Sequence, residues 1–128
     1  SEITKLAAIR IARGDVKLLS GDRQAAYDDY VIAAEFFRAF DIDEMIITLD
    51  VVANRIYETG RRSLESHFQV ASDLLAKATE IRLSQGHEQS AAQFKYKAAL
   101  IIRNQALKEN QSEASTLIDR AISLNREA

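Results

Sequence analysis

Cysteine, proline and tryptophan are missing from this 128-residue sequence, and glycine occurs only four times. Without cysteine the chain has neither disulfides nor thiolate metal ligands, a composition typical of a reducing compartment, so we predict a cytoplasmic location. The lack of proline and the scarcity of glycine remove the residues that interrupt helices, while 47% of the residues are hydrophobic. Together these features predict an all-α fold.

The sequence also lacks long apolar runs and extended regions of one charge. A membrane-spanning helix needs about 18 or more mostly apolar residues, and no run approaches that length, so no span is expected. The net charge is −2: residues 1–50 carry 6 basic and 10 acidic side chains, and residues 51–128 carry 11 and 9. Nucleic-acid-binding domains concentrate basic residues on one face, so we expect no nucleic-acid partner.

Glycines and capping residues divide the chain into about six helices. Gly21 is suited to end the first helix in the left-handed conformation, and Asp22 is suited to cap the second. Gly60 is expected to end the third helix, and Asn110 followed by Glu113 resembles a capping box for the sixth. The helices are expected to cover about residues 3–19, 23–40, 43–60, 63–85, 88–108 and 111–125.

Apolar residues recur at helical spacing within each of these segments and predict which side faces the core. The connections are short, so successive helices should be antiparallel neighbours within a single domain covering residues 1–128. The expected core-facing stripes are Ile9, Ala12, Val16 and Leu19; Ala26, Tyr30, Ala33, Phe37 and Phe40; Met45, Leu49, Val52, Ala53 and Ile56; Leu64, Phe68, Ala71, Leu75 and Ala78; Ala91, Phe94, Ala98, Ile101 and Ile102; and Ala114, Leu117, Ile118, Ala121 and Leu124.

The hairpin around residues 18–37 contains Gly21, Asp22, Ala26, Tyr30 and Ala33, and in these residues it resembles a tetratricopeptide-repeat unit. A Gly-Asp turn is followed by a small residue at a helix crossing, then by an aromatic residue and a second alanine. The matching residues are Gly21, Asp22, Ala26, Tyr30 and Ala33, with partial repeats at Gly86, His87, Ala91 and Ala98 and at Asn110, Ala114, Ile118 and Ala121. The resemblance implies a right-handed array of helical hairpins that binds peptides or partner helices in a groove and performs no chemistry.

Residues 68–125 contain Phe68 and Ala71, then Gly86 and Ala91, then Leu117 and Ala121, and in these residues they also resemble the three-helix microtubule-interacting and trafficking domain. This resemblance implies three separate helices and, again, a role in binding short peptides between helices. The residues that carry it are Phe68, Gln69, Ala71, Leu74, Lys77 and Ala78 for the first helix, Gly86, Ala91 and Ala98 for the turn and second helix, and Leu117, Ile118, Asp119, Arg120 and Ala121 for the third.

Three cations share one side of the first helix and form a candidate binding site. Arg10, Arg13 and Lys17 stand at positions i, i+3 and i+7, opposite the expected apolar stripe. Such a line of cations suits an acidic peptide or a C-terminal carboxylate. The alternative is a solvated face whose charges are neutralised by acidic residues of the second helix, such as Asp28 or Asp29.

Five aromatic residues crowd into positions 27–40, more than one helix can direct into a single core. Packing between the first and third helices accounts for Tyr30, Phe37 and Phe40. Tyr27 and Phe36 are therefore candidates for an interface with a partner. In the alternative function, these two residues mediate homo-oligomerisation or assembly within a larger protein.

No residue pattern predicts catalysis, a metal or a cofactor. The acidic cluster Asp41, Asp43, Glu44 and Asp50 is explained by capping of the third helix and by the helix dipole, and it lacks the spacing of a calcium loop. His67 and His87 lie in different elements, without a zinc-ligand pattern. We therefore expect a non-enzymatic interaction module, an adaptor or scaffold, with no catalytic, cofactor or metal residues.

Overall fold

The fold is all-α, as the composition predicts. The computed structural model describes residues 2–62 and 67–127, and these residues form five helices and no strand. The helices are α1 (Glu2–Leu19), α2 (Arg23–Glu35), α3 (Ile42–Arg62), α4 (Phe68–Ser84) and α5 (Glu88–Glu127).

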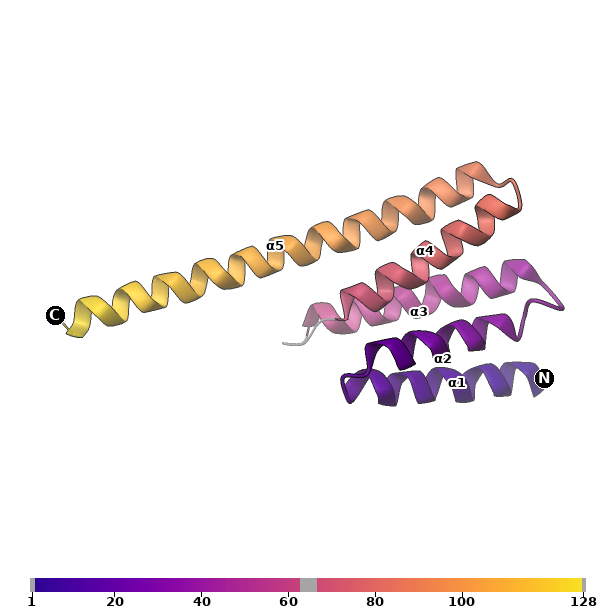
Figure 1. Cartoon of the computed structure of the whole chain (residues 1–128), viewed down its shortest axis with the longest axis horizontal. Helices are drawn as coiled ribbons and strands as arrows, with labels where there is room; N and C mark the ends of the chain where they lie inside the picture. The colour runs from indigo at the N-terminus through magenta and orange to yellow at the C-terminus, as the bar shows by residue number, and fades with distance from the viewer. Residues whose placement is uncertain (1, 63–66, 128) are drawn as a thin grey trace.

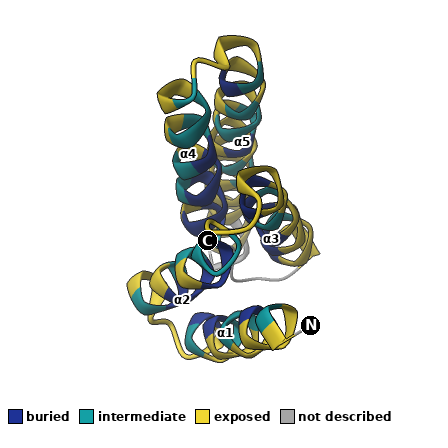
Figure 2. Cartoon of the chain, turned by 90° about the vertical axis from the view of Figure 1, so that its right-hand side faces the viewer, coloured by how far each residue is buried: buried dark blue, intermediate teal, exposed yellow. Residues whose placement is uncertain are grey.

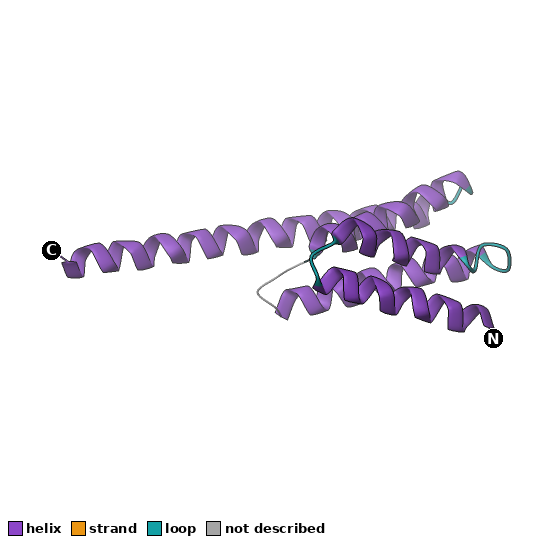
Figure 3. Cartoon of the chain, turned by 60° about the horizontal axis from the view of Figure 1, so that its bottom comes forward, coloured by secondary structure: helices purple, strands orange, loops and turns teal. Residues whose placement is uncertain are grey.

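Successive helices lie side by side in opposite directions, as the short connections predict. Contacts join α1 with α2, α2 with α3, α3 with α4 and α4 with α5, and α2 also packs against α4 (Figures 1 and 3). The core lies between α2, α3 and α4 and is completed by the first half of α5 (Figure 2). Helix α1 therefore covers one side of α2, while the second half of α5 extends past the other helices (Figure 1).

The turn between α1 and α2 has the predicted chemistry. Gly21 adopts φ +88°, a left-handed conformation that glycine reaches without steric cost. The Asp22 carboxylate then accepts a hydrogen bond of 3.1 Å from the backbone N–H of Ala25, which caps α2. Gly86, with φ +78°, occupies the corresponding position between α4 and α5. The prediction for Gly21 is confirmed.

Helix α2 ends earlier than predicted. Its last residue is Glu35, and residues 36–40 form successive tight turns that place Phe37 against the core. Phe40, expected to be buried, leaves 72% of its surface exposed because these turns rotate it away from the helical stripe. Asp41 accepts a hydrogen bond of 2.9 Å from the backbone N–H of Asp43 and thereby caps α3, the role expected of the acidic cluster.

Helices α3 and α4 present the predicted faces to the core. The whole α3 stripe from Met45 to Ile56 is buried, as are Phe68, Ala71, Leu75 and Ala78 of α4. Gly60 does not end α3, which continues to Arg62. The expected start of the fourth helix at residue 63, and Leu64 of its stripe, lie outside the described residues.

The prediction of six helices is wrong, because the fifth and sixth form the single helix α5. Asn110 lies inside this helix, where asparagine costs only about 0.6 kcal/mol relative to alanine. Neither glycine nor proline follows Gly86, so the sequence contains nothing strong enough to break the helix there. Residues 68–125 accordingly form two helices, in place of the three that the microtubule-interacting and trafficking resemblance implies.

The predicted core face of α1 is also wrong. Ile9, Val16 and Leu19 are exposed, and the buried residues are Ala7, Gly14 and Leu18. Gly14 explains this choice, since the ring of Tyr30 lies directly on its backbone: a Cβ atom there would meet Cε1 of Tyr30 at 2.6 Å. Small residues let α1 and α2 approach closely, and the bulkier apolar residues are left on the outside.

Replacing Gly14 with alanine is expected to lower the free energy of unfolding by about 1–3 kcal/mol through overpacking. In an ordinary helix interior the same change stabilises by about 0.5–1 kcal/mol. The sign reverses here because the Tyr30 ring is buried and cannot move aside. Urea denaturation measures the effect, and in a Tyr30→Leu background Gly14→Ala should become neutral or stabilising. Equal effects in the two backgrounds would contradict the close approach.

Candidate functional site

Two of the three predicted cations surround a buried carboxylate of α2. Asp29 has only 2% of its surface exposed. Its oxygens lie 3.2 Å from Nη1 of Arg10 and 2.7 Å from Nζ of Lys17. Both cations come from α1, one on each side of the Gly14 contact, so the ion pairs hold α1 on α2. This geometry agrees with the alternative given above, in which acidic residues of the second helix such as Asp29 neutralise the cations of the first helix.

The surroundings of Asp29 favour its charged form. Burial alone would raise the pKa of the Asp29 carboxyl, but hydrogen bonds from Lys17 and Arg10 and the charges of Lys17 and Arg13 hold that pKa below its usual range. Arg13 is exposed and acts through its charge. Binding of an acidic partner by Arg10, Arg13 and Lys17 stays a prediction, and Arg13 is the most accessible of the three.

A second polar contact joins α1 to α2 next to this cluster. The Tyr30 hydroxyl donates a hydrogen bond of 2.7 Å to Asp15, which lies 3.7 Å from the guanidinium of Arg55 on α3. Burial, together with the hydrogen bond to Asp15, raises the pKa of Tyr30 well above its ordinary value. These contacts fix the orientation of α1 relative to α2 and α3. The polar groups of Tyr30, Asp15 and Arg55 are thus paired with one another within the chain.

The predicted aromatic contact residues are both half-buried. Tyr27 packs against the core, and burial raises the pKa of its hydroxyl, with smaller contributions from Asp73 and Glu80 on α4 and from Asp28. Phe36 follows the end of α2. Their role in a partner interface stays a prediction.

An exposed apolar surface lies on the second half of α5. Every described side chain from residue 109 to residue 124 is exposed. Leu107 is 49% exposed, Leu117 is 63% exposed and Leu124 is 66% exposed. With 3.6 residues per turn these residues share one side of the helix. We call this surface the outer face of α5: Leu107, Ala114, Leu117, Ile118, Ala121 and Leu124.

From Ala114 to Leu124 the outer face points away from the bundle, while Leu107 at its start borders a hollow shared with Tyr57 and Phe68. The residues of α5 that pack on α4 are Ala91, Phe94, Ala98 and Ile101. At 3.6 residues per turn, their common side lies nearly opposite the outer face. Figure 2 shows the buried side of α5 turned toward α4, and Figure 1 shows its second half extending beyond the bundle. The sequence correctly grouped the apolar residues of this segment, but treated their face as core.

The start of the projecting segment is firmly attached to the bundle. Nδ2 of Asn104 donates a hydrogen bond of 2.8 Å to the hydroxyl of Tyr57 on α3, and Nζ of Lys108 donates one of 3.3 Å to the carbonyl of Gly60. The ammonium of Lys108 also lies 5.7 Å from the centroid of the Phe68 ring. The outer face is therefore carried on a helix whose direction is fixed by the core.

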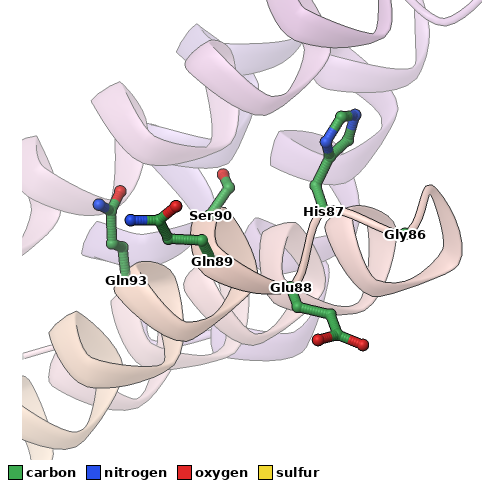
Figure 4. A pocket seen from close by; sticks show the side chains of 6 residues that line it. All are labelled: Gly86, His87, Glu88, Gln89, Ser90 and Gln93. Carbon is green, nitrogen blue, oxygen red and sulfur yellow. The ribbon is translucent and has the colours of Figure 1, made fainter.

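An open hollow at the turn between α4 and α5 does not assemble a catalytic group. It is lined by Gly86, His87, Glu88, Gln89, Ser90 and Gln93 (Figure 4). In Figure 4 the Glu88 carboxylate points to the other side of the ribbon from His87 and Ser90, so acid, base and hydroxyl do not converge. Across residues 2–62 and 67–127, no group of three or more histidine or acidic residues could hold a metal ion.

Comparison with known proteins returns no match to a family model, to a curated protein or to a solved structure. None of the helices in the described part of the chain combines the length and the apolar character needed to cross a membrane.

Proposed function

We propose that this chain is a non-enzymatic protein–protein interaction module, an adaptor or scaffold, that packs a partner helix against the outer face of α5. The observation that carries the proposal is the exposed apolar stripe on a helix that has left its own bundle. Exposed apolar surface of this kind, flanked by polar residues, is typical of interaction sites. A partner helix laid along it would bury residues at i, i+3 and i+7 spacing.

The length of the projecting segment supports a helical partner. Residues 109–127 form about 28 Å of helix at about 1.5 Å per residue. Helices that lack tertiary packing are only marginally stable in water, because most helical stability in proteins comes from burial of an apolar face. Docking of a second helix supplies that burial. The first half of α5, held by α4, supplies a preformed start for the helix and lowers the ordering cost of binding.

The tetratricopeptide resemblance agrees with this function and is part of the proposal. Arrays of that kind expose the sides of their helices to peptides, and we propose the same use of helix sides here, in a right-handed arrangement of hairpins. The absence of cysteine fits a cytoplasmic setting. Arg13 and the half-buried Tyr27 and Phe36 remain second candidates for partner contact.

A pull-down with paired baits tests the proposal. Leu117→Asp with Leu124→Asp places charges on the outer face, whereas Thr116→Asp with Ser123→Asp places the same charges on a neighbouring exposed side, about 100° around the same helix. We expect proteins captured from lysate by the wild-type chain to be retained by the Thr116→Asp, Ser123→Asp bait and lost from the other. Burying a carboxylate in an apolar interface costs several kcal/mol, more than a thousandfold in affinity at about 1.4 kcal/mol per factor of ten.

Both baits add two acidic residues, so a difference between them reports the face and not the net charge. Neither pair touches the core, and circular dichroism should show equal helix content for both folded bundles. If both baits capture the same proteins as the wild-type chain, the outer face is not the binding surface.

A further inference from the structure

The outer face of α5 has the residue spacing of a coiled-coil seam. Leu107, Ala114 and Ala121 lie seven residues apart, and Asn110, Leu117 and Leu124 follow each of them by three residues. These are the a and d positions of a heptad repeat, with residue 107 at position a. All six residues are exposed. The repeat covers residues 107–124, about 27 Å of helix.

The seam is complementary to itself when a second copy runs in the opposite direction. In an antiparallel pair each a position faces a d position of the other helix. One register then pairs every layer: Leu107 faces Leu124 of the second copy, Ala114 faces Leu117, and Ala121 faces Asn110, the one polar residue of the seam. Large residues face small ones in the two central layers, which is the arrangement that close packing requires.

We infer that the partner helix is α5 of a second copy, docked antiparallel so that the chain forms a two-fold symmetric dimer through residues 107–124. This inference rests on the proposed function and names the partner of the same face. Each contact occurs twice, as a two-fold interface requires.

The charges beside the seam favour the antiparallel direction. Glu113 and Arg120 both occupy g positions, and in this register Glu113 lies opposite Arg120 of the second copy, twice per dimer. A parallel pair would place Glu113 next to Ile118 and would leave both charges without an interhelical partner. Charged residues at these positions set partner choice and orientation in coiled coils. Both side chains are exposed in the single chain and accessible to a second copy.

The direction of docking decides where the two bundles lie. In each copy α4 packs on the side of α5 opposite the outer face, and Tyr57 and Phe68 lie beside Leu107 at the start of the seam. Antiparallel docking therefore places the two bundles at opposite ends of the paired helices and on their outer sides. A parallel dimer would bring both bundles to the same end.

The first test is the mass of the wild-type chain in solution, by sedimentation equilibrium at tens of micromolar protein. We expect twice the chain mass, with Leu117→Asp reduced to a monomer and the matched Thr116→Asp variant still dimeric. A wild-type chain that stays monomeric would refute the inference. So would a dimer that Leu117→Asp leaves unchanged.

Charge reversal then tests the register. Glu113→Arg alone, or Arg120→Glu alone, sets two pairs of like charges against each other and should raise the dimer Kd about tenfold at low salt. The combined Glu113→Arg, Arg120→Glu variant restores opposite charges and should return the Kd to within about threefold of the wild-type value. Single variants that leave the Kd unchanged would rule out this antiparallel register.

The outcomes separate this inference from the proposed function. A monomeric wild-type chain that captures another protein through the outer face would refute self-pairing and leave the helix-binding function intact. A monomeric chain without face-dependent capture would refute both. A dimer that dissociates in Leu117→Asp supports both.

Discussion

Replacing both Arg10 and Lys17 with methionine is expected to lower the free energy of unfolding at neutral pH by about 3–5 kcal/mol. Asp29 would then remain buried between α1 and α2 without its two cations. Methionine keeps much of the aliphatic length of both side chains, so the loss reports the missing charges more than missing packing. Urea denaturation followed by circular dichroism measures the change. Arg13→Met, which removes an exposed cation of the same face, should stay within about 0.5 kcal/mol of the wild type.

The pH dependence of stability should change direction in this double variant. In the wild-type chain the pKa of Asp29 is held below its usual range. Its stabilising contribution is therefore fully present above the unfolded-state pKa of about 3.9 and is lost as the pH falls through the folded-state value. Without Arg10 and Lys17, burial raises that pKa, and the Asp29 contribution is lost as the pH rises above about 4.

A double variant with wild-type stability at neutral pH would show that Asp29 does not need these cations. The result also matters for the predicted acidic-peptide site. Replacing Arg10, Arg13 and Lys17 with glutamate would disrupt the packing of α1 on α2. Loss of a partner from such a variant would therefore not show that these residues bind it. Arg13→Glu alone tests that site without disturbing the ion pairs of Asp29.

Phe68→Ala is expected to lower the free energy of unfolding by about 3–5 kcal/mol, the range of large core truncations. Phe68 is 1% exposed at the start of α4, its ring centroid lies 5.5 Å from that of Tyr57 on α3, and the ammonium of Lys108 on α5 lies above its ring. The substitution removes contacts among three helices at the point where α5 leaves the bundle. Urea denaturation measures the loss.

Phe40→Ala is the matched control for this truncation. Phe40 carries the same side chain but is largely exposed after α2, so its removal should change the free energy of unfolding by no more than about 0.5 kcal/mol. Phe68→Leu keeps most of the buried volume and should cost less than about 1.5 kcal/mol. Similar losses for Phe68→Ala and Phe40→Ala would contradict the difference in burial between the two rings.

The sequence predicted best where a helix has one clear apolar side. Met45, Leu49 and Val52 of α3 share one such side, and all three are buried as expected. Helix α1 has two possible sides. Its larger residues, Val16 and Leu19, gave the stronger hydrophobic signal, but close packing selected the smaller side. A hydrophobicity pattern does not reveal that Gly14, which has no side chain, leaves space for the ring of Tyr30 from the neighbouring helix.

The candidate site was predictable in part for a related reason. The apolar stripe from Ala114 to Leu124 was visible in the sequence, since helical spacing alone reveals it. Its exposure was not predictable, because Asn110 and Glu113 suggested a cap and a separate final helix folded back onto the bundle. An N-cap stabilises a helix by only about 1 kcal/mol. Asn110 and Glu113 can also stand inside a continuous helix, since no glycine or proline interrupts it there. For Arg10 and Lys17 the sequence left two alternatives open, an acidic partner or neutralisation by acidic residues of the second helix, and the pairing with Asp29 is the second of these.

Because α5 is one continuous helix, the direction in which its first half faces also fixes the direction in which its second half faces. One residue inserted near position 109 would turn the outer face from Ala114 onward by about 100° around the helix axis relative to the bundle, because an α-helix has about 3.6 residues per turn. Seven inserted residues would return it to within about 20° of its original direction while moving it about 10 Å farther out. The length of helix α5 thus fixes both the distance of the outer face from the bundle and the direction in which it points. Insertions of seven residues preserve that direction, and insertions of one residue do not.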